Sequence, residues 1–454
     1  MKKSIGILFI LTIIIGSFYI YFSPTFEKNP PKITFEGGKY WNLRDKFIIH
    51  ITDESPIKSY RVTLINDNNH KVLKTQQFLP SENKKDIKID VKLPQFYQIK
   101  GNKITLKVEA VDSSKWNWFA GNEAYAEDDL IVDTIYPTAE VINNSYSIAH
   151  GGSAVAIVKV KDENLKEAYI KITDRDNPTH FYKFKLTPFY KKDYYISLLA
   201  WPYDFSGFSA DLVVKDKANN ISKSHIPLRW KLPKYVHRKI KISENFIKRV
   251  DIPILQKMNM NIPNDLAEVF KIVNEKIRKI NEENIYKITN SILEQKVNNF
   301  YLHAFRPMKG ATKEAGYGEQ RSYIFDNQII SHAIHKGIDL ASFRHAKIYA
   351  SNAGKVIFEG WLGIYGNTLA LYHKLGLVST YSHCSSFNVE TNSNVYRGSV
   401  IAHTGSTGAV FGDHLHFGIY IQGIAVQPLE WMDSNWIKSH IINVIISAKR
   451  TINK

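Results

Sequence analysis

The stretch GDHLHFGIYI, residues 412–421, carries the clearest structural signal in the chain. His414 and His416 stand two residues apart, so in a strand their side chains share one face, because successive side chains of a strand point to opposite sides. The other face then carries apolar side chains, namely Leu415, Phe417, Ile419 and Ile421. This alternation predicts a β-strand that buries its apolar face in a core and turns both imidazoles into a groove.

A second histidine segment, SHAIHKGIDLAS at 331–342, lies upstream. Its His335 and Asp339 are four residues apart, which places both on one side of the segment whether it is helical or extended. Two histidines and one aspartate suit zinc, and a catalytic zinc site has three protein ligands with water in the fourth position. Zinc lowers the pKa of that water and polarises a scissile carbonyl. These segments therefore indicate a hydrolytic zinc site.

A third segment, STYSHCSSF at 379–387, adds His383. The sequence contains no HExxH helix, so the glutamate base of thermolysin-type proteases has no counterpart here. A histidine must then transfer the proton or orient the water, and its unperturbed pKa of about 6.5 allows this.

These segments together resemble the lysostaphin-like, or LytM-type, zinc endopeptidases of bacterial cell walls. The resemblance covers roughly residues 305–433 and includes, in order, an HxxxD element, a TYSH element and a GDHLHFG element. It implies that His335, Asp339 and His416 bind one zinc ion. It also implies a compact antiparallel β domain with a long groove suited to an extended peptide.

The same resemblance makes His383 and His414 a catalytic pair that does not bind the metal. His414 would take the proton of the zinc-bound water or orient it, and His383 would stabilise the oxyanion of the tetrahedral intermediate. The function implied is hydrolysis of peptide cross-links in peptidoglycan. The alternative is a binding regulator of other cell wall hydrolases, since some LytM-type domains have lost zinc ligands. The complete set of ligands and catalytic histidines favours the enzyme.

The remaining histidines of this region match no ligand position, and we expect surface or groove-lining positions for His332, His345, His373 and His403. Cys384 is expected to be a small buried side chain, because a redox switch would need an exposed thiolate of low pKa. It is the only cysteine of the chain, which excludes an intrachain disulfide and a cysteine-based zinc site.

Residues 30–233 consist of short alternating apolar runs between clusters of Asn, Asp, Gly and Ser, which predicts β-sandwich modules. Two copies follow each other in the same order, so we expect immunoglobulin-like domains at 30–135 and 136–233. The acidic residues Asp53, Glu54, Asp162 and Glu163 fall at expected strand ends. We interpret them as turn or Asx-cap residues rather than as a calcium site.

Between residues 239 and 299 the apolar period becomes helical, which predicts a helical connector. Its apolar stripe begins after Pro263, Asn264 and Asp265, a plausible helix start, and comprises Leu266, Val269, Phe270, Val273, Ile277 and Ile280. We expect this helix to pack on a neighbouring domain, and an inhibitory lid over the active site is the alternative. The peptidase domain then spans 300–436, and a basic helical tail spans 437–454.

The uncharged segment at 4–22, SIGILFILTIIIGSFYIYF, would span roughly 28 Å as a helix, which matches a bilayer core. Lys2 and Lys3 precede it and favour an N-inside orientation. A cleaved signal peptide usually has an apolar region of about 7 to 15 residues and a small-x-small site, which this segment lacks. We therefore expect an uncleaved anchor in a bacterial cytoplasmic (inner) membrane, with the catalytic domain in the periplasm or outside the cell.

The chain has 454 residues, enough for several domains, and a net charge of +17. A basic surface suits nucleic acid, anionic lipid or cell wall, or it merely keeps the protein soluble. The sequence has no compact basic cluster of the kind that reads nucleic acid, and export would separate the chain from it. We therefore expect peptidoglycan peptides and the membrane as partners, and no nucleic acid. The overall class is mainly β.

Overall fold

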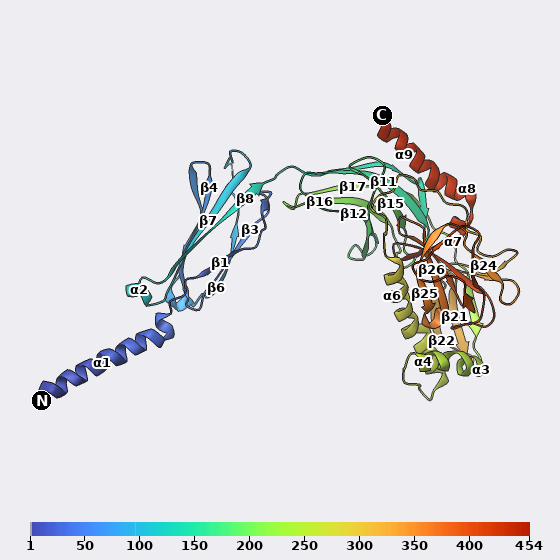
Figure 1. Cartoon of the computed structure of the whole chain (residues 1–454), viewed down its shortest axis with the longest axis horizontal. Helices are drawn as coiled ribbons and strands as arrows, with labels where there is room; N and C mark the ends of the chain where they lie inside the picture. Colours follow the sequence, from blue (N-terminus) through green and yellow to red (C-terminus); the bar gives the residue numbers. More distant parts are fainter. Residues whose placement is uncertain (1, 96) are drawn as a thin grey trace. The chain divides into compact units, whose positions relative to one another are not determined.

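The computed structural model describes residues 2–95 and 97–454. The chain forms two compact units (Figure 1). The first contains the residues up to Pro137 together with the short segments 162–166 and 215–221, and the second contains the remainder. The mainly β class with one N-terminal apolar helix is confirmed.

Helix α1 (Lys2–Phe22) contains an apolar stretch, Ile5–Phe22, with a mean hydropathy of 2.4. Its described side chains are almost all exposed, although they are predominantly apolar. A helix of this length and composition can cross a membrane, and a signal sequence near the N-terminus has the same properties. Membrane anchoring at 4–22 therefore stays a prediction.

The first unit contains two sheets that enclose a hydrophobic core. One sheet has the order β1 (Lys32–Phe35), β3 (Phe47–Thr52), β6 (Asp86–Val91). The other has the order β2 (Tyr40–Trp41), β8 (Glu123–Val132), β7 (Lys103–Asp112), β4 (Ile57–Asn66), β5 (Asn69–Gln77). Alternate residues of β3 and β7 are buried, as the period of two requires, and Ile49, Val62 and Leu106 are core members.

The acidic residues at the strand ends of this unit form Asx turns. Asp53 Oδ1 accepts a hydrogen bond from Ser55 N at 2.6 Å, and Asp162 Oδ1 accepts one from Asn164 N at 2.6 Å. The turn interpretation of both residues is therefore confirmed. The Asp53 carboxylate also lies close to those of Glu27 and Asp112, a grouping that the sequence analysis missed.

The second β region also contains two four-stranded sheets. Their orders are β14 (Thr187–Pro188), β15 (Tyr194–Ala200), β11 (Ser153–Lys161), β9 (Thr138–Asn144), and β13 (Phe181–Lys185), β12 (Leu165–Thr173), β16 (Ser209–Asp216), β17 (Ile221–His225). A short parallel pair joins β10 (Ser147–Ala149) to β18 (Arg229–Lys231). The immunoglobulin-like classification and the boundaries 30–135 and 136–233 stay predictions, whereas the sheet-rich character of both regions is observed.

The predicted connector begins with a strand rather than a helix. Strand β19 (His237–Lys241) pairs in parallel with β21 (Gln320–Phe325), which pairs with β22 (Gln328–Ile334). The helical elements follow, namely α3 (Glu244–Phe246), a π-helical turn η3 (Ile247–Asp251), α4 (Ile252–Lys257), α5 (Leu266–Lys271), a second π-helical turn η4 (Ile272–Ile277) and α6 (Arg278–Thr289). Asp265 caps α5 by accepting from Ala267 N at 3.0 Å, so the predicted helix start is confirmed.

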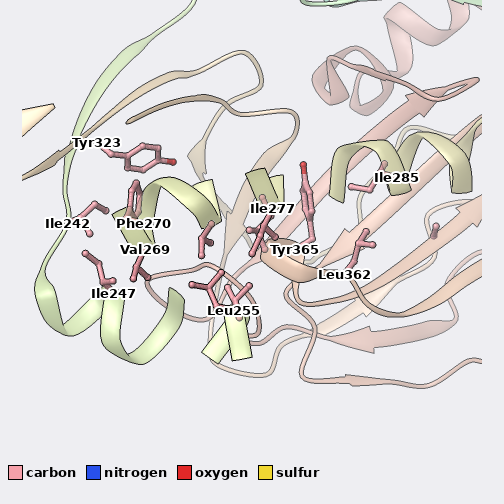
Figure 2. Close-up of a cluster of buried hydrophobic side chains, with 14 of the residues drawn as sticks. Ile242, Ile247, Leu255, Val269, Phe270, Ile277, Ile285, Tyr323, Leu362 and Tyr365 are labelled. Atoms are coloured by element: carbon pink, nitrogen blue, oxygen red, sulfur yellow. The ribbon is translucent and has the colours of Figure 1, made fainter. Parts of the chain in front are cut away.

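The connector helices share one hydrophobic core with the C-terminal domain (Figure 2). Val269, Phe270, Val273 and Ile277 of the predicted stripe are buried. On the other side of this core lie Tyr323 of β21 and the side chains of 362–365, with Tyr372, Val378 and Tyr420 of the sheet. The expectation that the helix packs on a neighbouring domain is correct, and the connector belongs structurally to that domain.

The C-terminal domain is built on an eight-stranded sheet with β31 at its centre. The order is β20 (Thr312–Ala315), β23 (Ile338–Ala341), β31 (Leu415–Ile421), β27 (Leu377–Ser382), β26 (Asn367–Tyr372), β25 (Gly354–Trp361), β29 (Asn394–Val395), with β32 (Ile424–Val426) also paired to β31. A smaller sheet contains β24 (Lys347–Tyr349), β30 (Val400–His403) and β28 (Ser386–Phe387). The predicted strand at 415–421 is confirmed, but all seven of its residues are buried. The prediction that one face of this strand is buried and the other open is therefore incomplete, because Tyr420 is buried in the core shared with the connector.

The tail at 437–454 is helical, as expected, but it packs against the second β region. It follows α7 (Pro428–Met432) and α8 (Ser434–Trp436), and consists of η6 (Ile437–Ile442) and α9 (Asn443–Asn453) (Figure 1). Asn143 Nδ2 donates to Val444 O at 3.0 Å, and Ser145 Oγ donates to His440 O at 2.8 Å. Because this helix covers the outer face of β11, nearly every residue of that strand is buried.

Candidate metal centre

Three side chains, from the connection between β22 and β23, from β23 and from β31, point one atom each at a common centre. His335 Nε2, Asp339 Oδ1 and His416 Nδ1 are separated pairwise by 3.0 Å. Ligand atoms around tetrahedral zinc lie about 3.3 Å apart when each bond is about 2.0 to 2.1 Å long. The observed triangle therefore fits a small metal ion, and the nitrogen and oxygen donor set is one that zinc prefers.

The sheet order explains why these residues meet. Strand β31 lies between β23 and β27, and its His416 is paired with Asp339 on one side and with Ser382 on the other. Residues directly opposite each other on neighbouring strands have side chains about 5 Å apart. His383 follows Ser382 directly, so the middle segment reaches the same centre. All three motifs of the sequence analysis thus converge through the register of one sheet.

A shell of hydrogen bonds orients the candidate ligands. His335 Nδ1 donates to Gly316 O at 2.8 Å, which leaves the lone pair of Nε2 directed at the centre. Arg321 Nη2 donates to Asp339 Oδ2 at 3.3 Å, and Arg321 Nε donates to Glu319 Oε1 at 2.8 Å. Arg321 and Glu319 lie outside the three motifs, and no local pattern in the sequence distinguished them.

The two remaining histidines of the motifs lie at the edge of the triangle. His383 Nδ1 donates to Thr407 O at 2.8 Å, and His414 Nδ1 donates to Gly412 O at 2.9 Å. In both rings Nε2 is therefore the free nitrogen. His414 Nε2 lies 3.6 Å from Asp339 Oδ1, and the two ring centroids are 4.9 Å apart. The structure brings all five predicted site residues together, while their individual roles stay predictions.

The electrostatics of the site favour a neutral His416 and an ionised Asp339. Burial lowers the pKa of His416 to about 4 and holds that of His383 well below its usual value. Burial opposes ionisation of Asp339 as well, but its contacts with His335, His414 and His416 hold its pKa well below the usual range. A carboxylate beside neutral imidazoles is the state that binds a metal cation.

The other histidines lie outside the triangle, but the expected surface or groove-lining position is wrong for His373. His373 is buried, with its ring between Ala353 O and Ser379 Oγ, and burial lowers its pKa to about 4. The His332 side chain is exposed and lies 3.2 Å from Ser322 Oγ. Cys384 has no exposed surface, and burial raises the pKa of its thiol to about 12, as the expectation of an inert side chain requires.

The triangle borders a cavity of about 350 Å³ that the connector helps to form. From the C-terminal domain it is lined by the five motif residues and by the loop 409–413. From the connector it is lined by Ile240, Ile242, Phe246, Asp251, Phe270, Val273, Asn274 and Arg278. The rings of Phe246 and Phe411 are 4.5 Å apart and tie α3 to the loop before His414. The connector is thus one wall of the candidate active site.

Comparison with known proteins agrees with this geometry. The model of peptidase family M23 matches residues 333–428. The C-terminal domain is an M23 peptidase domain. Its matched region includes all five convergent residues.

Among the relatives of this M23 domain is the DD-carboxypeptidase/endopeptidase Mpg of Neisseria meningitidis serogroup B, 38% identical over 96 residues, or 21% of this chain and 22% of that protein. The murein hydrolase activator EnvC of Escherichia coli K12 is 33% identical over 129 residues, or 28% of this chain and 29% of that protein. The catalytic domain of lysostaphin from Staphylococcus simulans is 28% identical with a TM-score of 0.23, covering 27% of this chain and 93% of that one. The match thus spans under a third of each of the two curated relatives.

Proposed function

We propose that the chain is a zinc-dependent endopeptidase that hydrolyses peptide cross-links in bacterial peptidoglycan. The observation that carries this proposal is the triangle of His335, Asp339 and His416, with two further histidines at its edge. A group of histidines with a purely structural role would need only to have its own hydrogen bonds satisfied. Here Nδ1 of both His383 and His414 donates to a backbone carbonyl, so that both Nε2 lone pairs remain beside a cavity large enough for part of a peptide.

The chemistry follows from these positions. Zinc, when bound, supplies a water of lowered pKa and polarises the scissile carbonyl. His414 Nε2 is placed to accept a proton beside Asp339, because its other nitrogen already donates to a carbonyl. His383 Nε2 would donate to the oxyanion of the tetrahedral intermediate in the imidazolium form, because Nδ1 already donates to Thr407 O. Burial disfavours that form, and the negative charge of the oxyanion would stabilise it.

The second candidate is a regulator that binds peptidoglycan or another hydrolase without cutting. It is favoured by the relatives named as murein hydrolase activators. The complete set of five convergent residues supports the enzyme instead, because a protein that only binds peptidoglycan needs neither the three candidate ligands nor the two further histidines.

We further propose that α1 holds the chain at the cytoplasmic membrane, with the M23 domain on its outer side.

The decisive experiment compares ligand and non-ligand variants of the full chain. Asp339→Ala or His416→Ala should reduce zinc content and activity together, because a three-ligand site that loses one donor binds metal weakly. His383→Ala or His414→Ala should keep most of the zinc and lower turnover by roughly 10²- to 10⁴-fold. Zinc content is measured by elemental analysis, and cleavage by mass spectrometry of muropeptides.

His332→Ala is the matched control, because its exposed ring lies outside the triangle and should change neither quantity. A strong chelator should silence the wild type, and added zinc should restore it. Full activity of metal-free protein, or of either ligand variant, would reject the mechanism and leave the regulator as the better account.

A further inference from the structure

The basic side chains that line the catalytic cavity are already engaged by acceptors of the protein. Each has an oxygen partner within hydrogen-bonding or ion-pairing distance: Arg238 with Glu319 (3.4 Å), Arg278 with Asn274 (2.7 Å), Arg321 with Glu319 (2.8 Å) and Lys336 with Glu282 (2.7 Å). Arg238, Arg321 and Lys336 are therefore paired with carboxylates before any substrate arrives, whereas Arg278 is held by the neutral amide of Asn274.

Asp251 is a buried acidic side chain of the same cavity that lacks such a partner among the described residues, whereas Glu314, another acid of the lining, is exposed. Asp251 ends the π-helical turn η3 and is 1% exposed. Its Oδ2 has no hydrogen-bond partner among the residues that the structure describes, and its side chain does not cap the following helix α4. Burial, with no compensating charge, raises the pKa of this carboxyl to about 8.

An unpartnered buried carboxyl lowers the stability of the fold, because its desolvation is not offset by a hydrogen bond. The residue lines the cavity that also contains the metal triangle. A ligand bound in the cavity is therefore the candidate partner of this carboxyl group.

The surroundings of Asp251 in the cavity define what that partner can be. The connector side of the lining is mainly apolar and partly aromatic, with Ile242, Phe246 and Phe270 among its members, and its other polar residues are Asn274 and Arg278. An aliphatic chain packs on such walls, and a terminal ammonium can donate to a carboxylate in a charge-assisted hydrogen bond. This combination matches the side chain of a diamino acid.

We propose that Asp251 is a specificity determinant that binds an ammonium group of the peptide substrate, the free side-chain amine of a diamino-acid residue. The inference rests on the proposed function, because it assigns a subsite to the same active site. It makes the connector part of the substrate-binding surface. The cationic group is held by the connector, while the scissile bond lies over the metal triangle.

The test uses two muropeptides that share the scissile bond and differ only in the side-chain amine, free in one and N-acetylated in the other. The zinc-loaded full chain should cleave the free amine with a kcat/KM roughly tenfold higher, chiefly through a lower KM. Asp251→Asn should abolish this preference by slowing cleavage of the free-amine peptide alone. The control is Asp265→Asn. Asp265 is an exposed acid on the same connector, and asparagine can replace it as the cap of α5, so this variant should keep the preference.

Equal cleavage of both peptides by the wild type, or an unchanged preference in Asp251→Asn, would overturn the proposal. A higher melting temperature of Asp251→Asn with unchanged selectivity would assign the residue a merely structural position. Should the wild type cleave neither peptide, the proposed function fails by itself. Calorimetric binding of the same two peptides then decides the subsite, since only a preference for the free amine that depends on Asp251 supports it.

Discussion

At the scale of single residues, the candidate active site depends on groups that do not touch the reacting atoms. Arg321 is the clearest of them, because it lies between Asp339 and the buried Glu319. It balances two carboxylates in a site of low polarity and holds one oxygen of Asp339, so that the other can face the centre. We regard it as a positioning residue.

Replacing Arg321 by Met should therefore weaken zinc binding by roughly 10- to 100-fold, as is typical when a ligand loses its orienting partner. Competition with a chromogenic chelator measures the affinity directly. Arg238→Met is the matched control, because Arg238 contacts Glu319 but not Asp339. An equal loss in both variants would mean that Glu319, and not the orientation of Asp339, carries the effect.

Cys384 permits a second test at this scale. Its thiol is buried and its pKa is raised to about 12, so almost no thiolate exists at neutral pH. Iodoacetamide should leave the native protein unmodified over hours and should alkylate it fully in denaturant, as mass spectrometry would show. Rapid labelling of the native protein would mean that the strand end after β27 opens readily.

At the scale of elements, the junction between α7 and β11 connects the M23 domain to the second β region. Glu430 Oε2 accepts from Ser153 N at 2.9 Å, and Trp431 Nε1 donates to Ser153 Oγ at 2.9 Å. Burial raises the pKa of Glu430 to about 8, against smaller opposing effects of its hydrogen bonds with Ser153 and of the charge of Lys231. The protonated form is thus favoured in the folded protein.

This shift has a defined consequence for stability. Between pH 4.5 and about 8 the folded state binds more protons at Glu430 than the unfolded state, so this group lowers the free energy of unfolding as pH rises. Glu430→Gln keeps an acceptor for Ser153 and removes the titration. Its melting temperature should exceed that of the wild type by an amount that grows from pH 5 to pH 8, and a constant difference would contradict the assignment.

At the scale of the whole molecule, the connector and the M23 domain form one cooperative unit. Strand β19 pairs with β21 in a separate three-stranded sheet, and the connector helices cover apolar side chains of the eight-stranded sheet and of the loop at 362–365. Exposing a fully buried aliphatic or aromatic side chain costs about 1.5 to 3 kcal/mol. The sequence-based boundary at residue 300 therefore divides a single core.

A fragment of residues 300–454 should consequently aggregate or melt without cooperativity, whereas a fragment of residues 138–454 should melt in one sharp transition. Calorimetry and size-exclusion chromatography of the two fragments provide the comparison. A 300–454 fragment that melts cooperatively within a few degrees of the longer one would show that the connector is dispensable for the fold.

The membrane prediction belongs to the same scale. The full chain should remain in the membrane pellet after a high-salt wash, because α1 is held by apolar contact rather than by charge. A fragment beginning at residue 24 serves as the control and should be recovered in the supernatant. Recovery of the full-length gene product as a shortened soluble protein would identify α1 as a cleaved signal.

The sequence by itself determined the metal motif, because the relevant spacings are local. His414 and His416 lie on or beside one strand, and HxxxD needs only one short segment to present both candidate ligands. The same holds for the alternating strands, the helix start at Asp265 and the apolar N-terminal helix. In each case a period of two or 3.6 residues, or a single cap, contains the information.

Only the tertiary structure decided which distant residues support the site. Three features join segments that no sequence periodicity connects. They are the contact of Arg321 with Asp339, the contact of Gly316 with His335, and the contribution of the connector to the cavity. In the sequence Asp251 is an ordinary acid of a helical segment. Its proposed role rests on its burial and on the absence of a hydrogen-bond partner for Oδ2 among the described residues. Such features depend on which surfaces pack together, and the free energy of that packing is shared among many side chains at once.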